Sequence, residues 1–341
     1  MADLNKARRS TLRRGRMSVW IVIVFTISLA TDLVPALGAG TPPGIAGKVY
    51  FMTYGWSRSA RFDSPAGVFF NARKGEVYVA DSGKHEILVF DTVGTPITRI
   101  RHYVDGKKPG DSAAGEPKQV AVNSGGDIFV VDALAPYLDV LDHRGRQLKR
   151  VYPGDLLKLP REAARCTAVG IDHADNVYLG TGGEECAVLV LDRDLRLARR
   201  IGKKGTGEGG FQAITGIWVD AAGRTYVTDA LARPSVQVFS SDGKQVLSFG
   251  EHSAGPNNFS LPQGVVTDDL GDIYVLDGLR QVIAVFGPDG QYLTRLGGFG
   301  SAPGDLAYPT GIAGDGKRTL FTVERVGARL QGFKLDMASG S

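Results

Sequence analysis

Short apolar runs separated by polar, glycine-containing breaks recur along most of the chain. In "VYVADSGKHEILVFD" (77–91), two such runs are each closed by an acidic residue, and a polar turn sequence lies between them. The runs are rich in β-branched and aromatic residues and are too short for helices. This pattern predicts two antiparallel β-strands joined by a turn.

The first of these strands is one copy of a repeated segment, called strand B below. An aromatic residue returns in each copy at intervals of 47 to 51 residues, and a regular interval of this size indicates a repeat architecture. The six copies span 76–81, 127–132, 176–181, 224–229, 272–277 and 319–324, with the aromatic residues Tyr78, Phe129, Tyr178, Tyr226, Tyr274 and Phe321.

Three further strands accompany strand B in each repeat: strand A before it, and strands C and D after it. The short A–B and C–D turns are rich in Gly, Asn and Asp, which suit tight hairpins. Strand A is predicted at 67–71, 119–123, 168–172, 216–220, 264–268 and 311–315; strand C at 86–91, 137–142, 187–192, 235–240, 282–287 and 329–334; strand D at 96–101, 147–152, 197–202, 245–250 and 292–297.

Four antiparallel strands in each of six repeats predict an all-β fold, a six-bladed β-propeller in which each sheet is one blade. Strands B and C are apolar on both faces, as expected if each blade packs between two neighbours. Strand A contains Gly67, Gly216, Gly264 and Gly311. These glycines fit a crowded axis where the backbones of the inner strands converge.

The sixth repeat lacks strand D, while a spare strand, residues 48–56, precedes the first strand A. We therefore predict a 3+1 closure in which this N-terminal strand completes blade 6, with Tyr50 alongside Leu330–Lys334. Such a closure pairs the open edge of blade 6 and ties the two ends of the ring together. The propeller is then one domain over residues 41–338, followed by a tail at 339–341.

Residues 1–40 have a different character. A basic stretch with six Lys or Arg residues precedes the apolar run 17–30, and the small residues Ala36, Gly38 and Ala39 follow. This order predicts a secretory signal peptide. The alternative is an uncleaved membrane anchor helix over residues 17–38. Both interpretations place the propeller in the periplasm or outside the cell, and the anchor would hold it at the inner membrane.

The distribution of charge argues against nucleic-acid binding. The whole chain has a formal net charge of +4, and residues 1–40 alone account for +4, so residues 41–341 sum to zero. A protein that binds nucleic acid needs an excess of basic side chains to contact phosphates. We therefore expect no nucleic-acid partner, and contact with a membrane only through the N-terminal segment.

The segment 77–91 resembles the NHL repeat. Asp81, Ser82, Gly83 and His85 match the turn of that repeat, and the following strand matches its second strand. The resemblance extends over residues 47 to about 335 and is strongest in the first blade. NHL propellers commonly bind other molecules without catalysing a reaction, so the resemblance implies a non-enzymatic binding or scaffold module without a cofactor.

Together with the predicted export, this role implies a partner protein in the cell envelope, or a small ligand. The face formed by the B–C and D–A loops, called the loop face below, is the expected binding surface. Exposed Tyr and Arg side chains commonly anchor interfaces. The candidates are Lys84, His85, Tyr137, Arg233 and Arg280 in B–C loops, with Lys107 and Lys108 in the long first D–A loop.

An acidic residue closes strand B in most copies, and we call this set the acid column. It could form a ring for a cation or a basic partner. The structural alternative, which we favour, is that each carboxylate accepts backbone N–H groups of its own B–C turn. The column comprises Asp81, Asp132, Asp229, Asp277 and Glu324, with Thr181 in the third copy.

The alternative function is a metal-dependent lyase or lactonase, because six-bladed propellers of similar shape support such chemistry. The histidines do not favour it, since they are divided between the two faces and between distant blades. The positions near the start of strand A hold residues that are poor metal ligands in most copies, and Gln119 is the only strongly polar residue at the first predicted position of strand A. The positions near the start are Pro65, Pro117, Cys166, Ile214, Pro262 and Pro309. We expect no metal site.

The chain has only two cysteines, Cys166 and Cys186, and both fall in the third repeat at the same end of their strands. In an exported protein, two such residues favour a disulfide bond. The sequence therefore predicts a Cys166–Cys186 disulfide.

Overall fold

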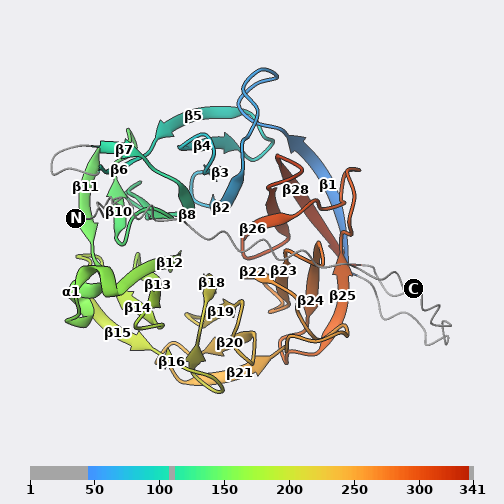
Figure 1. Cartoon of the computed structure of the whole chain (residues 1–341). Helices are drawn as coiled ribbons and strands as arrows, with labels where there is room; N and C mark the ends of the chain where they lie inside the picture. Colours follow the sequence, from blue (N-terminus) through green and yellow to red (C-terminus); the bar gives the residue numbers. More distant parts are fainter. Residues whose placement is uncertain (1–44, 107–111, 338–341) are drawn as a thin grey trace, which may run out of the picture. The chain divides into compact units, whose positions relative to one another are not determined.

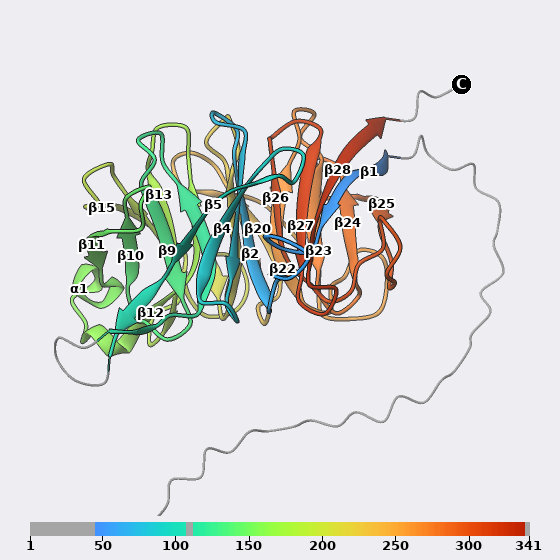
Figure 2. The same cartoon turned by 90° about the horizontal axis from the view of Figure 1, so that it is seen from above.

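The computed structural model describes residues 45–106 and 112–337. In this part of the chain, six four-stranded antiparallel sheets surround a central axis (Figure 1), which confirms the six-bladed β-propeller. In each blade strand A lies nearest the axis and strand D, or β1 in blade 6, lies outermost. Figure 2 shows the same blades from the side, with the turns gathered at the two ends of the ring.

The predicted strands are all present, with shifts of a few residues at their ends. Blade 1 comprises β2 (Pro65–Asn71), β3 (Glu76–Asp81), β4 (Glu86–Asp91) and β5 (Pro96–Arg101); blade 2 comprises β8 (Pro117–Val122), β9 (Ile128–Asp132), β10 (Leu138–Leu141) and β11 (Gln147–Val151); blade 3 comprises β12 (Ala164–Ile171), β13 (Val177–Gly183), β14 (Val188–Leu191) and β15 (Leu197–Ile201). Blade 4 comprises β18 (Ile214–Val219), β19 (Thr225–Asp229), β20 (Val236–Phe239) and β21 (Gln245–Phe249); blade 5 comprises β22 (Pro262–Thr267), β23 (Ile273–Asp277), β24 (Val282–Phe286) and β25 (Tyr292–Leu296).

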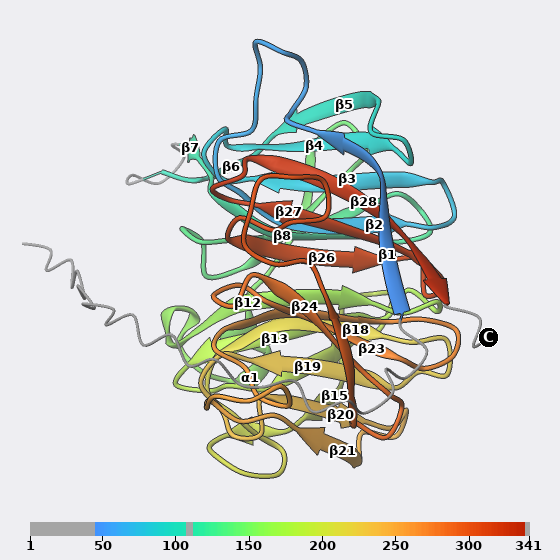
Figure 3. The same ribbon diagram turned by 90° about the vertical axis from the view of Figure 1, so that its right-hand side faces the viewer.

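Blade 6 joins the two ends of the propeller, as predicted. It comprises β26 (Pro309–Gly314), β27 (Thr319–Glu324), β28 (Arg329–Met337) and the N-terminal β1 (Ile45–Thr53). Val49 lies opposite Phe333 and Phe51 opposite Gly332, with Tyr50 in a bulge between them. Figure 3 shows the blue β1 alongside the red β28. The closing strand begins and ends about three residues earlier than the predicted segment 48–56.

Strand A begins earlier than predicted in every blade, and the cause is a β-bulge. In each described blade one residue near the start of strand A has no partner on strand B, and pairing resumes after it. A bulge disturbs the alternation of apolar and polar positions and re-aims the extra side chain. The bulged residues are Ala66, Lys118, Thr167, Thr215, Gln263 and Thr310.

The core lies between neighbouring blades, because strands B and C present apolar side chains on both faces. Between blades 2 and 3, for example, Val131 and Leu138 pack with Leu179 and Leu189. Such side chains are almost fully removed from water, and burial of this apolar surface is the main force holding the blades together.

The axis is crowded, as the glycines of strand A predict. A methyl group on Gly67 would lie 2.2 Å from the carbonyl oxygen of Lys118, and one on Gly216 would lie 2.7 Å from the Cα of Gly264. In blade 2 the corresponding position is Gln119. Its side chain reaches over blade 3 to blade 4 and fills the centre of the ring.

Several short elements were not predicted, and all lie in D–A loops. They lack the alternation that marks longer strands. They are β6 (Tyr103–Asp105) and β7 (Ser112–Ala114), the helices α1 (Pro153–Leu157) and η1 (Arg161–Ala163), and the two-residue strands β16 (Lys203–Lys204) and β17 (Gly210–Phe211). Between residues 45 and 337, outside the gap at 107–111, no helix is long and apolar enough to span a membrane. The predicted leader 1–40, its alternative anchor 17–38 and the tail 339–341 lie outside the described residues.

Candidate binding face

The acid column lies on the loop face, but its carboxylates are buried. All five accept hydrogen bonds, although Asp132 Oδ2 has no hydrogen-bond partner and lies 3.3 Å from His102 Nε2. Asp229 accepts the backbone N–H groups of Leu231 at 2.9 Å and Ala232 at 2.7 Å. Asp132 and Asp277 accept the equivalent N–H groups of their own turns. All five side chains belong to residues at most 2% exposed. Asp132, Asp229 and Asp277 agree with the structural interpretation, whereas Asp81 and Glu324 accept the backbone N–H groups of Asp63 and Ala307 in other loops. The buried column does not form an open acidic ring.

The same carboxylates also bind the preceding D–A loop, which the sequence did not suggest. Asp229 accepts the N–H groups of Gln212 at 2.7 Å and Ala213 at 2.9 Å, 16 or 17 residues upstream. Asp277 binds Ser260 in the same way, and Asp81 binds Asp63. Each of these carboxylates therefore fastens the loop that enters its blade. Burial raises the pKa of Asp81 to about 7, although the backbone N–H of Asp63 lowers it in part.

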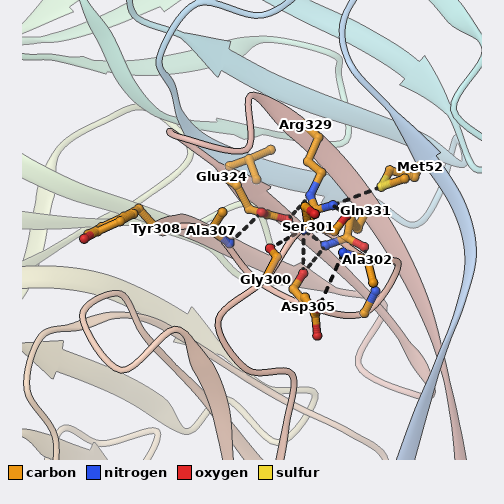
Figure 4. Close-up of polar contacts among 12 residues, drawn as sticks. Met52, Gly300, Ser301, Ala302, Asp305, Ala307, Tyr308, Glu324, Arg329 and Gln331 are labelled. Carbon is orange, nitrogen blue, oxygen red and sulfur yellow. Dashed lines mark hydrogen bonds and ion pairs between the residues drawn. The ribbon is translucent and has the colours of Figure 1, made fainter.

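In blade 6 the acid column becomes an ion-pair cluster, shown in Figure 4. Glu324 Oε1 accepts hydrogen bonds from Arg329 Nε at 2.8 Å and from Gln331 Nε2 at 2.6 Å. The Arg329 guanidinium also donates to the carbonyl oxygens of Ser301 and Asp305, both at 2.7 Å. The cluster fixes the D–A loop that follows blade 5, close to the closing strand β1.

Two of the predicted binding residues are structural. Tyr137 is 2% exposed; its hydroxyl accepts the backbone N–H of Asp105 at 3.1 Å, and the Arg150 guanidinium lies 4.5 Å from its ring centre. Arg280 donates to the carbonyl oxygens of Ser253 and Gly255, both at 2.6 Å. The prediction that Tyr137 is free to bind a partner is wrong, because a D–A loop covers it. Arg280 is partly exposed, but its guanidinium is bonded to a D–A loop.

The remaining candidates divide between exposed and anchored residues. Lys84 and Arg233 are exposed on B–C loops, as predicted. His85 is half-buried, and its Nδ1 lies 2.7 Å from the carbonyl oxygen of Gly115 in the first D–A loop. Lys107 and Lys108 lie outside the described residues.

An exposed apolar residue occupies the same place in four B–C turns, two positions after the acid column. These side chains surround the axis at the loop face, and we call them the apolar rim. They are Leu134, Leu231, Leu279 and Val326, and they are 55–65% exposed. Blades 1 and 3 have Gly83 and Gly183 at this position. The sequence analysis missed the rim, although aligning the turns would have revealed it.

A cavity of about 350 Å³ lies at the same end of the channel, and Leu279 of the rim lines it. The bulged residues of strand A line its floor, and Leu279 and Tyr308 form part of its wall. It contains two basic side chains, Lys118 and Arg325, and no acidic residue is among its described lining residues. Gln119 separates it from the narrow remainder of the channel. Sequence reasoning missed Lys118, which lies one residue before the predicted strand A of blade 2 (119–123).

The opposite end of the channel has a larger cavity, of about 570 Å³, between the A–B turns. Half-buried Phe69 and Trp218 line it, and carboxylates surround it. These carboxylates belong to turn residues such as Asp220 and Asp268, which accept N–H groups of their own A–B turns. They are thus engaged in holding the turns.

Residues 62–90 match the family model of the NHL repeat. This segment contains strands B and C of blade 1 and the turn closed by Asp81. The chain is a six-bladed β-propeller whose first blade contains an NHL repeat. No curated protein sequence matches the chain.

Solved structures similar to this NHL-repeat propeller share its fold at low sequence identity. Regucalcin, a calcium-binding protein from Agrobacterium tumefaciens, is 14% identical, with a TM-score of 0.56 over 86% of this chain and 94% of that one. A catalytically inactive virginiamycin B lyase from Staphylococcus aureus, crystallised with quinupristin, is 12% identical, with a TM-score of 0.54 over 80% and 95%. A Bacteroides thetaiotaomicron protein of unknown function is 14% identical, with a TM-score of 0.58 over 87% and 73%.

The two cysteines of the NHL-repeat propeller are free thiols, so the predicted disulfide is wrong. Cys166 packs with Val131 and Leu138 of blade 2, whereas Cys186 packs with Phe211 and Ile214 on the other side of blade 3. The two side chains lie on opposite faces of one sheet. Burial raises the pKa of both thiols, that of Cys186 to about 11.

Proposed function

We propose that this NHL-repeat propeller is a non-enzymatic binding module that docks a protein partner on its loop face. The observation that carries the proposal is the apolar rim, in which four B–C turns expose Leu or Val at one shared position. The four side chains belong to different blades but recur at one position of the loop face, and a partner that spans several blades would contact them together. Exposed apolar surface covered by a partner is typical of interaction sites. A partner with apolar side chains would remove this rim from water.

The turns hold the rim residues in place before any partner binds. The backbone N–H of Leu134 donates to Asp132, that of Leu231 to Asp229, and that of Leu279 to Asp277. The acid column therefore fixes the backbone at each rim leucine. Binding then costs less conformational entropy than it would on mobile loops.

The predicted leader supports a partner in the cell envelope, since both interpretations of residues 1–40 place the propeller in the periplasm or outside the cell. Exposed Lys84 and Arg233 add positive charge near the rim. They suit a partner whose contact surface is apolar at its centre and acidic at its edge.

A photo-crosslinking amino acid at the rim tests the proposal in the full-length chain, expressed in its own cells. We expect a discrete adduct with one other protein from position 231, and loss of that adduct when Leu134→Ser is added. Leu148, which is 54% exposed on the outer strand of blade 2, is the matched control position and should give no such adduct. Equal crosslinking from position 148, or an adduct only with a second copy of this chain, would overturn the proposal.

The alternative of a metal-dependent lyase or lactonase gains no support from the side chains. Over residues 45–106 and 112–337, no group of three or more His, Cys, Asp or Glu residues is arranged to hold a metal ion. The similarity to a lyase is at 12% identity and concerns the fold alone.

A further inference from the structure

We infer that the central cavity of the loop face is a binding site for a small ligand that carries a carboxylate on an apolar group. This goes beyond the docking of a protein on the rim, because the site lies inside the cavity and can be filled without a partner protein. The inference depends on the charge, the polar floor and the apolar wall of the cavity.

The cavity is positively charged. Lys118 and Arg325 both line it, and neither forms an ion pair within the described part of the chain. Burial lowers the pKa of Lys118, and the charge of Arg325 lowers it further; the carboxylates of Glu116 and Asp132 act in the opposite direction without reaching ion-pair distance. Lys118 is half-buried, whereas Arg325 is exposed. A partly buried cation that lacks a counterion, such as Lys118, is costly. A bound anion would offset this cost.

The floor offers at least one polar group without a partner. The hydroxyl groups of Thr215 and Thr310 donate to carbonyl oxygens of the next blade, at 2.7 and 2.8 Å, and are thus engaged. The equivalent hydroxyl of Thr167 is buried and has no hydrogen-bond partner. The hydroxyl oxygen itself is buried, so the Thr167 side chain would have to change rotamer to donate a hydrogen bond to a carboxylate held by the two cations. The six bulges aim these side chains together, and bulges are common beside binding sites.

The wall is apolar. Ile214, Leu261, Leu279, Tyr308 and Pro309 line the same cavity. A volume of about 350 Å³ lies within the range of small-molecule sites, which are largely apolar with a few placed polar groups. An alkyl or aryl chain would contact this wall, while its carboxylate faces Lys118 and Arg325. A small inorganic anion would leave the wall uncovered.

Calorimetric titration of the full-length chain with octanoate tests the inference. We expect octanoate to bind, octanamide to bind at least tenfold more weakly because it lacks the charge, and inorganic phosphate not to compete. Binding of octanamide as tight as that of octanoate, or no binding of octanoate at millimolar concentration, would overturn the inference.

Variants locate the site. Lys118→Gln and Arg325→Gln should each weaken octanoate binding at least tenfold, while Lys118→Arg, which keeps the charge, should retain it and show that the cavity remains folded. Lys317→Gln removes a lysine that lines the opposite cavity and is the matched control. Unchanged octanoate binding by Lys118→Gln would contradict the assignment. Since the crosslinking test uses Leu231, which is not among the lining residues of this cavity, either proposal can fail without the other.

Discussion

The side-chain amide of Gln119 donates a hydrogen bond of 2.6 Å to the backbone carbonyl oxygen of Thr215, two blades away. Its Oε1 accepts the backbone N–H of Val169 at 3.1 Å in the blade between them. One side chain thus links blades 2, 3 and 4 at the axis. The glycines at most of the corresponding positions leave the space that this single long side chain occupies.

Replacing Gln119 should therefore weaken the ring. In Gln119→Ala the N–H of Val169 and the carbonyl of Thr215 lose their partners, and we expect the free energy of unfolding to fall by about 1–3 kcal/mol. Urea denaturation measures the change. Gln291→Ala, at an exposed residue of a C–D turn, is the control and should have little effect. An equal fall in the free energy of unfolding of both variants would show that the hydrogen bonds of Gln119 do not stabilise the ring.

The buried pair of Glu324 and Arg329 should behave as a coupled unit. Arg329→Met leaves the Glu324 carboxylate buried without its cation, which we expect to cost about 3–5 kcal/mol of unfolding free energy. Adding Glu324→Gln removes the stranded charge and should recover part of that loss. A double-mutant cycle by chemical denaturation measures the coupling. If the effects of the two substitutions on the free energy of unfolding were additive, Glu324 and Arg329 would not be coupled.

Replacing Asp229 should test most directly whether the acid column holds the D–A loops in place. Asp229→Ala removes the acceptor for N–H groups on both the D–A loop and the B–C turn. We expect a loss of about 3 kcal/mol in unfolding free energy, and faster hydrogen exchange at Gln212 and Ala213. Asp242→Ala, at an exposed turn residue, is the control. Protected amides at both loop positions would contradict this role.

Asp81 should make stability depend on pH. Its pKa is raised to about 7 in the folded state, from 3.8, so the folded protein favours the protonated form. The resulting contribution to stability is fully present below about pH 4 and is lost as the pH rises through 7. Wild-type protein should therefore gain stability relative to Asp81→Asn as the pH falls from 8 to 4. Denaturation curves across this range measure the difference; a constant difference would refute the shift.

The repeat made most of the fold predictable. Strands B and C could be located closely because they are apolar on both faces, and Tyr78 and its counterparts set the register. The beginning of strand A could not be located, because a bulge at residues such as Lys118 interrupts the alternation that marks a strand. The bulge depends on how the inner strands pack against one another at the axis. No local sequence pattern indicates that packing.

The candidate site was predictable only in part. The acid column followed from its position in the turn, but its second set of bonds, from Asp229 to Gln212 for example, joins segments 17 residues apart. Tyr137 and Arg280 belong to loops and have polar groups, which suggested exposure. A D–A loop nevertheless buries Tyr137, and another binds the guanidinium of Arg280. Cys166 and Cys186 lie in one blade, but the sequence did not show that they face opposite neighbours.

The number of blades, the strand order and the closure of the ring by the N-terminal strand were determined by the sequence alone, because each depends on a local pattern that repeats. Only the tertiary structure decided which side chains are available to bind another molecule. Lys118, Arg325 and the rim residue Leu279 meet in one cavity only because separate blades bring their loops to the same end of the axis. The burial of side chains, their hydrogen bonds and the charge of the cavity at that end arise from contacts between blades. These contacts follow no repeating pattern along the sequence.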